Sequence, residues 1–97
     1  MPSVRHVTLV ANTAQLVTLD DTNSSAFEVL NRNGLGEIYI SHDGTASPVA
    51  PTVGGNNFDV VPAATGASMQ IRRTGTGVIA VRLISAAATT CSVRGIS

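Results

Sequence analysis

The sequence predicts an all-β protein that folds as an antiparallel β-sandwich of about eight short strands. Short runs rich in Val, Ile and Leu alternate with clusters of Gly, Asn, Thr, Ser and Pro, which are typical of strands separated by turns. No window carries the apolar stripe of an amphipathic helix of useful length. The predicted strands cover residues 4–10, 15–19, 26–32, 37–42, 58–61, 68–73, 78–85 and 91–94.

The first two runs have the alternation of half-buried strands. In the first run, Val7 and Leu9 alternate with His6 and Thr8. The second run ends at a polar loop, residues 20–25, whose Asp, Asn and Ser side chains can hydrogen-bond their own backbone. We therefore expect two strands, the second of which is followed by a polar turn region.

The third and fourth runs flank a strong turn signal. The third run places Phe27 and Val29 on one face, and the fourth run places Ile38 and Ile40 on one face. Between them, an Asn-Gly pair tolerates the positive φ angles of a tight turn, so residues 33–36 predict a hairpin.

Residues 46–57 do not resemble a strand. They contain Pro48, Pro51, Gly54 and Gly55, and proline donates no hydrogen bond to a sheet ladder. This stretch is therefore predicted to be a long ordered loop in an extended or polyproline-like conformation.

The remaining runs complete the sandwich. The fifth run ends at Pro62, and the sixth places Met69 and Ile71 on one side. The Gly-rich residues 74–77 predict a second hairpin. The run 78–85 is the most apolar and is predicted to be a central strand, whereas the Ala-rich link after it is shorter than the roughly 12 residues of a stable isolated helix.

Regular spacing and mostly short connections favour antiparallel pairing. The first choice of architecture is a jelly-roll-like sandwich, and the alternative is an immunoglobulin-like sandwich. The pattern does not fix the order of the strands. No linker divides the chain, so residues 1–97 are predicted to form a single domain.

The composition predicts a thin core and a partner. The chain has two Phe, one Tyr and no Trp, so its core must be mostly aliphatic. Small domains with thin cores often gain stability from oligomerisation or docking. The net charge is zero, every basic residue is Arg, and only Arg72 and Arg73 are adjacent. Without a basic face or stacking aromatics, we expect no binding to nucleic acid.

The chemistry-bearing residues do not form a recognisable site. His6, His42 and Cys91 lack the close spacing of zinc ligands, and no Ser lies in a Gly-x-Ser-x-Gly turn. We therefore expect no metal, no cofactor and no enzymatic activity. Neither a signal peptide nor an apolar run of roughly 20 residues is evident, so we expect synthesis in a cytoplasm and no membrane partner.

Several short segments together carry a resemblance that covers most of the chain. They are VTLVANT at 7–13, VTLD at 17–20, FEVLNRNG at 27–34, IYIS at 38–41, DGT at 43–45, PTVGGNN at 51–57, VPA at 61–63 and VRLIS at 81–85. In this order they resemble small virion proteins of tailed bacteriophages. The chain is most similar to the minor capsid, or decoration (cement), proteins, which bind the outside of an assembled shell.

The resemblance implies a β-sandwich that forms a homotrimer at local threefold positions of an icosahedral shell. Its partners would be the major capsid protein and further copies of itself. It would clamp adjacent capsomers on the capsid surface of the virion, after synthesis in the cytoplasm of a host bacterium. The alternatives are a tail, head-fibre or baseplate module, and a receptor- or sugar-binding sandwich.

Three segments are candidate partner contacts. Residues 1–6 are a possible N-terminal arm, residues 46–57 a rigid contact loop, and the Arg pair a partner for acidic groups of the shell. The corresponding alternatives are a frayed end, a crossover that covers one end of the core, and a charged edge strand that blocks aggregation. The candidate contact residues are Val4, Arg5, His6, Pro48, Val49, Pro51, Val53, Arg72 and Arg73.

Overall fold

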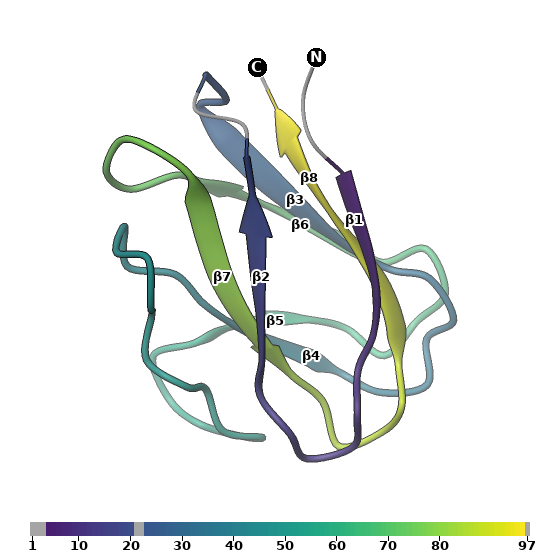
Figure 1. Ribbon diagram of the computed structural model, residues 1–97. Coiled ribbons are helices and arrows are strands. Elements are labelled where there is room, and N and C mark those ends of the chain that lie inside the picture. Colours follow the sequence, from purple (N-terminus) through teal and green to yellow (C-terminus); the bar gives the residue numbers. More distant parts are fainter. Residues whose placement is uncertain (1–3, 21–22, 97) are drawn as a thin grey trace.

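The computed structural model describes residues 4–20 and 23–96, and two four-stranded sheets pack face to face in it (Figure 1). The described residues contain no helix. The first sheet has the order β1 (Val4–Thr8), β8 (Thr90–Ile96), β3 (Ala26–Asn31), β6 (Ser68–Arg72). The second has the order β2 (Gln15–Leu19), β7 (Ile79–Ile84), β4 (Ile38–Ser41), β5 (Asp59–Val61).

The pairing is nested, because β1 pairs with β8, β2 with β7, β3 with β6 and β4 with β5, always antiparallel. This nested pairing is the jelly-roll arrangement. The predicted jelly-roll-like sandwich is therefore confirmed, and the fold is not the immunoglobulin-like alternative. Each predicted strand is present, and no strand end lies more than two residues from its expected position. The prediction that residues 78–85 hold a central strand is also confirmed, since β7 lies between β2 and β4.

The predicted hairpins at 33–36 and 74–77 are wrong. Strands β3 and β6 belong to one sheet and β4 and β7 to the other, so both turns carry the chain across the sandwich. Gly34 and Gly77 do adopt positive φ angles, 67° and 88°, as the turn signals predicted. A tight turn fixes the local backbone, but it does not choose the strand with which the chain pairs next.

The core lies between the sheets and is aliphatic, as the composition predicted. Of the core side chains in the described residues, only Phe27 is aromatic, and the ring of His42 meets its ring edge-on at 4.9 Å between centroids. Full burial of such a side chain stabilises the fold by about 1.5–3 kcal/mol. The fully enclosed core residues include Leu9, Leu19, Val29, Ile38, Val61, Ile79, Val81, Leu83 and Val93.

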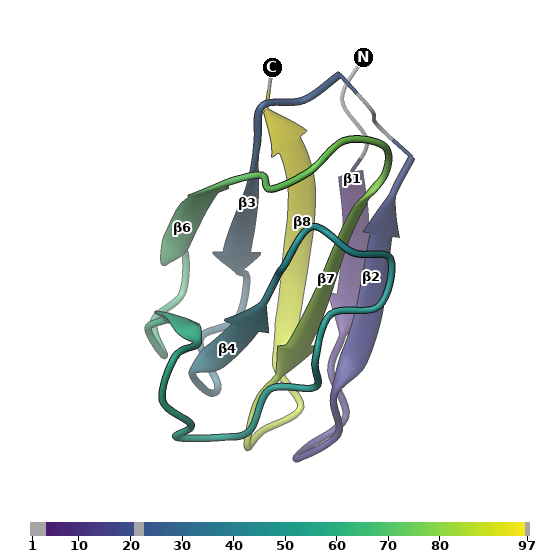
Figure 2. The same ribbon diagram turned by 90° about the vertical axis from the view of Figure 1, so that its left-hand side faces the viewer.

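The connection from β4 to β5 runs over the outer face of the second sheet (Figure 2). Arg82 on β7 points away from the core and holds this loop. Its Nε donates to the carbonyl of Pro48 at 2.6 Å, and its Nη2 donates to the hydroxyl of Ser47 at 2.9 Å. The longest loop of the described chain is therefore fastened to its own sheet.

Candidate functional site

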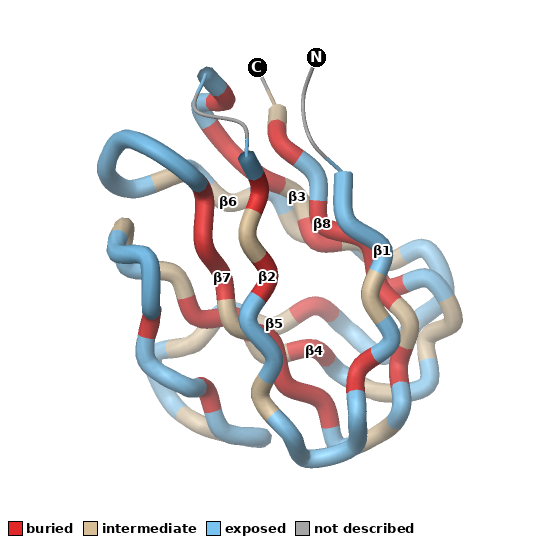
Figure 3. Tube along the Cα trace, viewed as in Figure 1, coloured by how far each residue is buried: buried red, intermediate tan, exposed pale blue. Residues whose placement is uncertain are grey.

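The two ends of the sandwich differ in chemistry. Residues 9–14, 32–37, 62–67 and 85–89 form four loops at the lower end in Figure 2, which we name the apolar end; the β4–β5 connection also reaches this end before it turns back to β5. Val10 is 62% exposed there and Leu35 is 64% exposed. The smaller exposed apolar residues of these loops are Ala11, Pro62, Ala63, Ala64, Ala86 and Ala88, and the exposed uncharged residues beside them are Asn12, Thr13, Thr65 and Gly66. The burial map marks most of this end as exposed (Figure 3).

Charge is nearly absent from the apolar end. Of its residues, only Arg32 and Glu37 are charged, and both are exposed. Leu35 lies between these two residues in one loop, and the other three loops carry no charge. Large exposed apolar side chains with few neighbouring charges are typical of interaction surfaces, whose centres are depleted of charged residues.

A buried asparagine holds the apolar end together. Asn31, at the end of β3, is fully buried. Its Nδ2 donates to the carbonyls of Gly36 at 3.0 Å and Pro62 at 2.9 Å, and its Oδ1 accepts from the backbone N–H of Gly34 at 2.9 Å. One side chain therefore fixes the loop between β3 and β4 to the loop between β5 and β6.

Backbone hydrogen bonds join the other two loops to these. The N–H of Leu9 donates to the carbonyl of Thr89 at 2.9 Å, and the N–H of Asn12 donates to the carbonyl of Ser85 at 2.7 Å. The N–H of Thr90 donates to the Asn33 side-chain oxygen at 3.2 Å. The apolar end is thus one connected assembly of loops.

The opposite end, which we name the polar end, consists of residues 20, 23–25, 42–46 and 73–78. Its loops also contact one another, since the N–H of Thr74 donates to His42 Nε2 at 3.0 Å. The other ring nitrogen, Nδ1, lies 2.9 Å from the carbonyl of Ala80. These two contacts assign the neutral Nδ1–H tautomer to His42.

Asp43 is the best-defined acid of the polar end. Its Oδ1 accepts from the hydroxyl of Thr45 at 2.6 Å and from the N–H of Thr45 at 2.9 Å. These two hydrogen bonds, the hydroxyl first, hold the pKa of the Asp43 carboxyl below its ordinary value. Asp43 therefore remains a carboxylate throughout the neutral range.

The candidate contact residues near the N-terminus lie on β1. Residues 1–3 of the predicted arm fall outside the described residues, whereas Val4, Arg5 and His6 pair with β8. His6 Nδ1 lies 2.7 Å from the hydroxyl of Ser92, and Arg5 forms an exposed ion pair at 3.4 Å with Asp20. All three candidates are exposed, and their contact role stays a prediction.

The Arg pair and the long loop lie elsewhere. Arg72 is exposed on β6, at the opposite edge of the sheet from β1, and Arg73 Nη2 donates to the carbonyl of Gly77 at 2.6 Å. In the loop 46–57, Pro48 and Pro51 are buried, whereas Val49 is 64% exposed and Val53 is 42% exposed. The candidate contact residues therefore do not form one surface.

The sequence reasoning did not find the apolar end. Along the chain, two strands separate each of its loops from the next. Only the nested pairing of the strands brings these loops to the same end. The available signal was the small number of charged residues in these turns. The sequence shows this for each turn separately and does not indicate that the turns lie together.

Within the described part of the chain, Ser92 and His6 form a close pair that resembles part of a catalytic site. Ser92 lies on β8, which is paired on both sides with β1 and β3. The backbone N–H groups around it therefore take part in the sheet ladders, and the pair has no oxyanion donors aimed at it. The contact between Ser92 and His6 is a cross-strand pair on the sheet surface.

Other chemically active groups are dispersed or buried. Within residues 4–20 and 23–96, no three His, Cys, Asp or Glu side chains are grouped so that they could hold a metal ion. Burial raises the pKa of the Cys91 thiol to about 11, so this thiol is protonated at neutral pH.

The described part of the chain has no helix that is long and apolar enough to cross a membrane.

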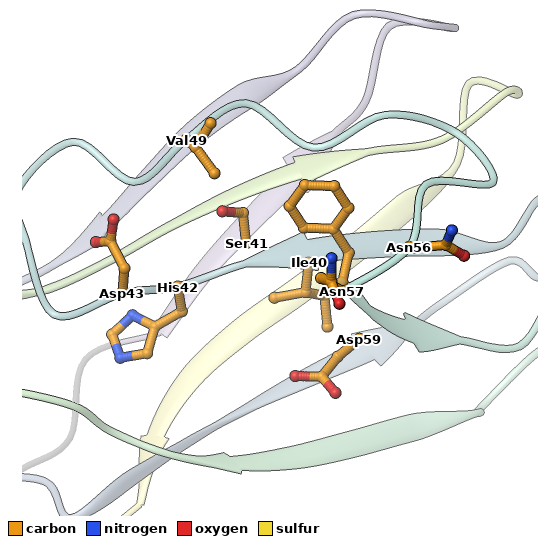
Figure 4. Close-up of a pocket in the computed structure, with 9 residues that line it drawn as sticks. Ile40, Ser41, His42, Asp43, Val49, Asn56, Asn57 and Asp59 are labelled. Carbon is orange, nitrogen blue, oxygen red and sulfur yellow. The ribbon is translucent and has the colours of Figure 1, made fainter.

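A hollow of about 400 Å³ lies between β4, β5 and the returning part of the long loop (Figure 4). Its lining combines polar and apolar side chains, which are Ile40, Ser41, His42, Asp43, Val49, Asn56, Asn57, Phe58 and Asp59. The sequence reasoning did not identify this hollow, because it forms only when the loop folds back against its own sheet.

Comparisons with known proteins leave the family open. No family model matches the sequence, and no curated protein matches it. Among solved structures, the chain is similar to a de novo designed double-stranded β-helix determined by solution NMR. The two are 14% identical with a TM-score of 0.43, and the match covers 97% of this chain and 94% of that chain.

Proposed function

We propose that this chain is a structural virion protein that binds the outside of a bacteriophage capsid through its apolar end and stabilises contacts between capsomers. The observation that carries the proposal is the apolar end itself, which exposes Val10 and Leu35 and has two charged residues, Arg32 and Glu37, in its four loops. Such a surface fits the apolar, charge-poor centre of a protein–protein interface.

The rigidity of the apolar end supports the same role. Its loops are connected by the side chain of Asn31 and by backbone hydrogen bonds, so they lose little conformational freedom on docking. Jelly rolls occur in viral capsid domains and in lectins, so the fold is compatible with the proposal. The fold alone does not imply this function. The proposed protein acts by shape and not by catalysis, and it acts as a homotrimer.

Copy number in purified virus particles tests the proposal. A quantitative protein gel of particles that carry this chain should show copies comparable in number to the shell protein. A few copies per particle would identify a tail, head-fibre or baseplate module instead. The mass of the purified protein in solution should correspond to three chains, and a monomer that does not sediment with shells would contradict the proposal.

Two matched variants test the surface. Leu35→Asp places a charge on the apolar end, and Val78→Asp places the same charge on a 42% exposed valine at the polar end. Co-sedimentation with shells should weaken at least about tenfold for Leu35→Asp, which corresponds to about 1.4 kcal/mol, and should be unchanged for Val78→Asp. Equal binding by both variants would exclude the apolar end as the docking surface.

A further inference from the structure

The hollow beside β4 has polar groups at opposite sides and an apolar wall. Asp59 lies directly opposite Ile40 in the pairing of β4 with β5, and Asp43 follows the end of β4. Figure 4 shows Asp43 and Asp59 at different sides of the hollow, with Val49 of the long loop across from the strand. The space of about 400 Å³ falls within the usual range of small-molecule sites.

Several polar side chains of the hollow are free to accept a ligand. Among the described residues, the side chains of Asn56, Asn57 and Asp59 make no hydrogen bond within the chain. Asp43 uses Oδ1 for both hydrogen bonds from Thr45, so its Oδ2 is free. Amide and carboxylate groups arranged in this way can both donate to and accept from the hydroxyl groups of a ligand.

Apolar atoms complete the lining. The partly buried ring of Phe58 and the exposed side chain of Val49 line the hollow, and Ile40, a core residue that is 2% exposed, adds only a small apolar area at its base. A ligand that suits this lining has hydroxyl groups on its rim and C–H groups on its face, which is the chemistry of a pyranose ring.

The charges of the hollow select against anions. Its lining contains two carboxylates, Asp43 and Asp59, and no Arg. His42 is in its neutral tautomer because its Nε2 accepts from the N–H of Thr74. A negatively charged ligand would meet repulsion from both acids, whereas a neutral one would not.

The loop that forms the wall is preorganised. Arg82 holds it through Pro48, and Gly55 packs so closely on Phe58 that an added Cβ would lie 3.0 Å from the ring. Asn57 adopts a left-handed backbone with φ 70°, a conformation that non-glycine residues rarely take and that is over-represented at functional sites. A wall fixed in advance reduces the entropy lost on binding.

From these observations we infer that the hollow binds a neutral pyranose sugar. The inference goes beyond the proposed function, because the hollow shares no lining residue with the apolar end. A particle that carried many copies of the chain would then present many weak sugar sites, and their number would strengthen attachment to a glycan-bearing surface.

Titration of the ¹⁵N-labelled protein with methyl glycosides of glucose, galactose, mannose and N-acetylglucosamine tests the inference by NMR. Millimolar concentrations suit the weak affinity of a shallow site. At least one of these sugars should shift the amide signals of residues 40–43 and 55–59, and signals of the apolar end should not move. The methyl glycoside of glucuronic acid, an anionic counterpart of the glucoside, should bind at least tenfold more weakly than the glucoside if glucose is the sugar bound.

Variants assign the site. Asn57→Gly keeps the left-handed backbone while it removes the amide, and Asp59→Ala removes a carboxylate at the hollow; each should reduce binding at least tenfold. Gln70→Ala changes an exposed polar residue on β6 of the other sheet and should leave binding unchanged. An intact spectrum for Asn57→Gly will show that the fold is retained.

Absence of any shift with all four neutral sugars would overturn the inference, as would unchanged binding by both hollow variants. Shell binding by Asn57→Gly separates this result from the proposed function, because that variant keeps the whole apolar end. Sugar binding without shell binding would leave the inference standing and contradict the proposed function.

Discussion

The two ends of the sandwich are carried by the same strands, yet the turns at 33–36 and 74–77, which cross between the sheets at opposite ends, are packed differently. At the apolar end, Gly34 lies against the backbone of the loop between β5 and β6, where an added Cβ would meet the carbonyl carbon of Ala64 at 2.8 Å. At the polar end, an added Cβ on Gly77 would meet nothing within 4 Å. The two crossing turns therefore differ in packing, although both ends contain loops in contact: at the polar end, an added Cβ on Gly44 would meet the carbonyl oxygen of Thr74 at 2.9 Å.

The largest effect is expected from Asn31→Ala. This change leaves the carbonyl of Gly36 and the N–H of Gly34 without a partner, whereas the carbonyl of Pro62 keeps the N–H of Ala64 at 2.9 Å. Unsatisfied buried groups cost about 1–3 kcal/mol each, so we expect the free energy of unfolding to fall by about 4 kcal/mol in a urea titration.

Asn33→Ala is the control for that change, because Asn33 is only partly buried and its oxygen accepts from the N–H of Thr90 at 3.2 Å. It should cost about 1 kcal/mol. If the two variants were equally stable, Asn31 would not be the residue that holds the apolar end together.

Glycine substitutions compare the packing of the two ends directly. Gly34→Ala combines the strain of a left-handed alanine, about 1–2 kcal/mol, with a clash against the neighbouring loop, about 1–3 kcal/mol. We expect a loss of about 3 kcal/mol for Gly34→Ala and about 1 kcal/mol for Gly77→Ala, which has only the strain. Thermal unfolding of both variants measures the difference, and equal losses would show that the two crossing turns are packed alike.

The long loop over the outer face of the second sheet is held by the side chain of Arg82. Arg82→Met removes the hydrogen bonds to Pro48 and Ser47, so we expect a loss of about 1.5 kcal/mol and faster amide exchange across residues 46–57. Arg94→Met removes an exposed pair at 3.0 Å with Glu28 and should cost less than about 1 kcal/mol. Unchanged exchange in the loop of Arg82→Met would mean that other contacts hold it.

The smallest effect concerns the titration of Asp43. Because its pKa is lowered in the folded state, its hydrogen bonds with Thr45 stabilise the fold above the ordinary value of 3.8 and are lost as the pH falls through the folded pKa. Thr45→Val removes the hydroxyl, which is the largest cause, so the pKa of Asp43 should rise towards 3.8. Carbon-detected NMR titration of the carboxyl measures this, and a pKa unaffected by the substitution would contradict the assigned cause.

The strands could be predicted because burial on one face imposes a period of two residues. In β3, Phe27, Val29 and Asn31 are all fully buried, as their alternation indicated. The partners of the strands could not be predicted, because a turn such as Asn33-Gly34 has the same local chemistry in a hairpin and in a crossing between sheets.

The candidate site could be predicted only in small part. Pro48 and Pro51 carry a clear signal of an ordered loop, but nothing near them in the sequence indicates that Arg82 fastens this loop to its own sheet. Likewise, the loops that carry Val10 and Leu35 lie at the same end only through the nested order of the strands. Surfaces built from distant loops depend on topology, which periodicity does not encode.

A cryo-electron microscopy reconstruction of particles that carry this chain tests the central claim most directly. The account predicts three copies around local threefold axes of the shell, with the loops 9–14, 32–37, 62–67 and 85–89 against the shell protein. Contact through the polar end or through a sheet face, or a position confined to the tail, would contradict it.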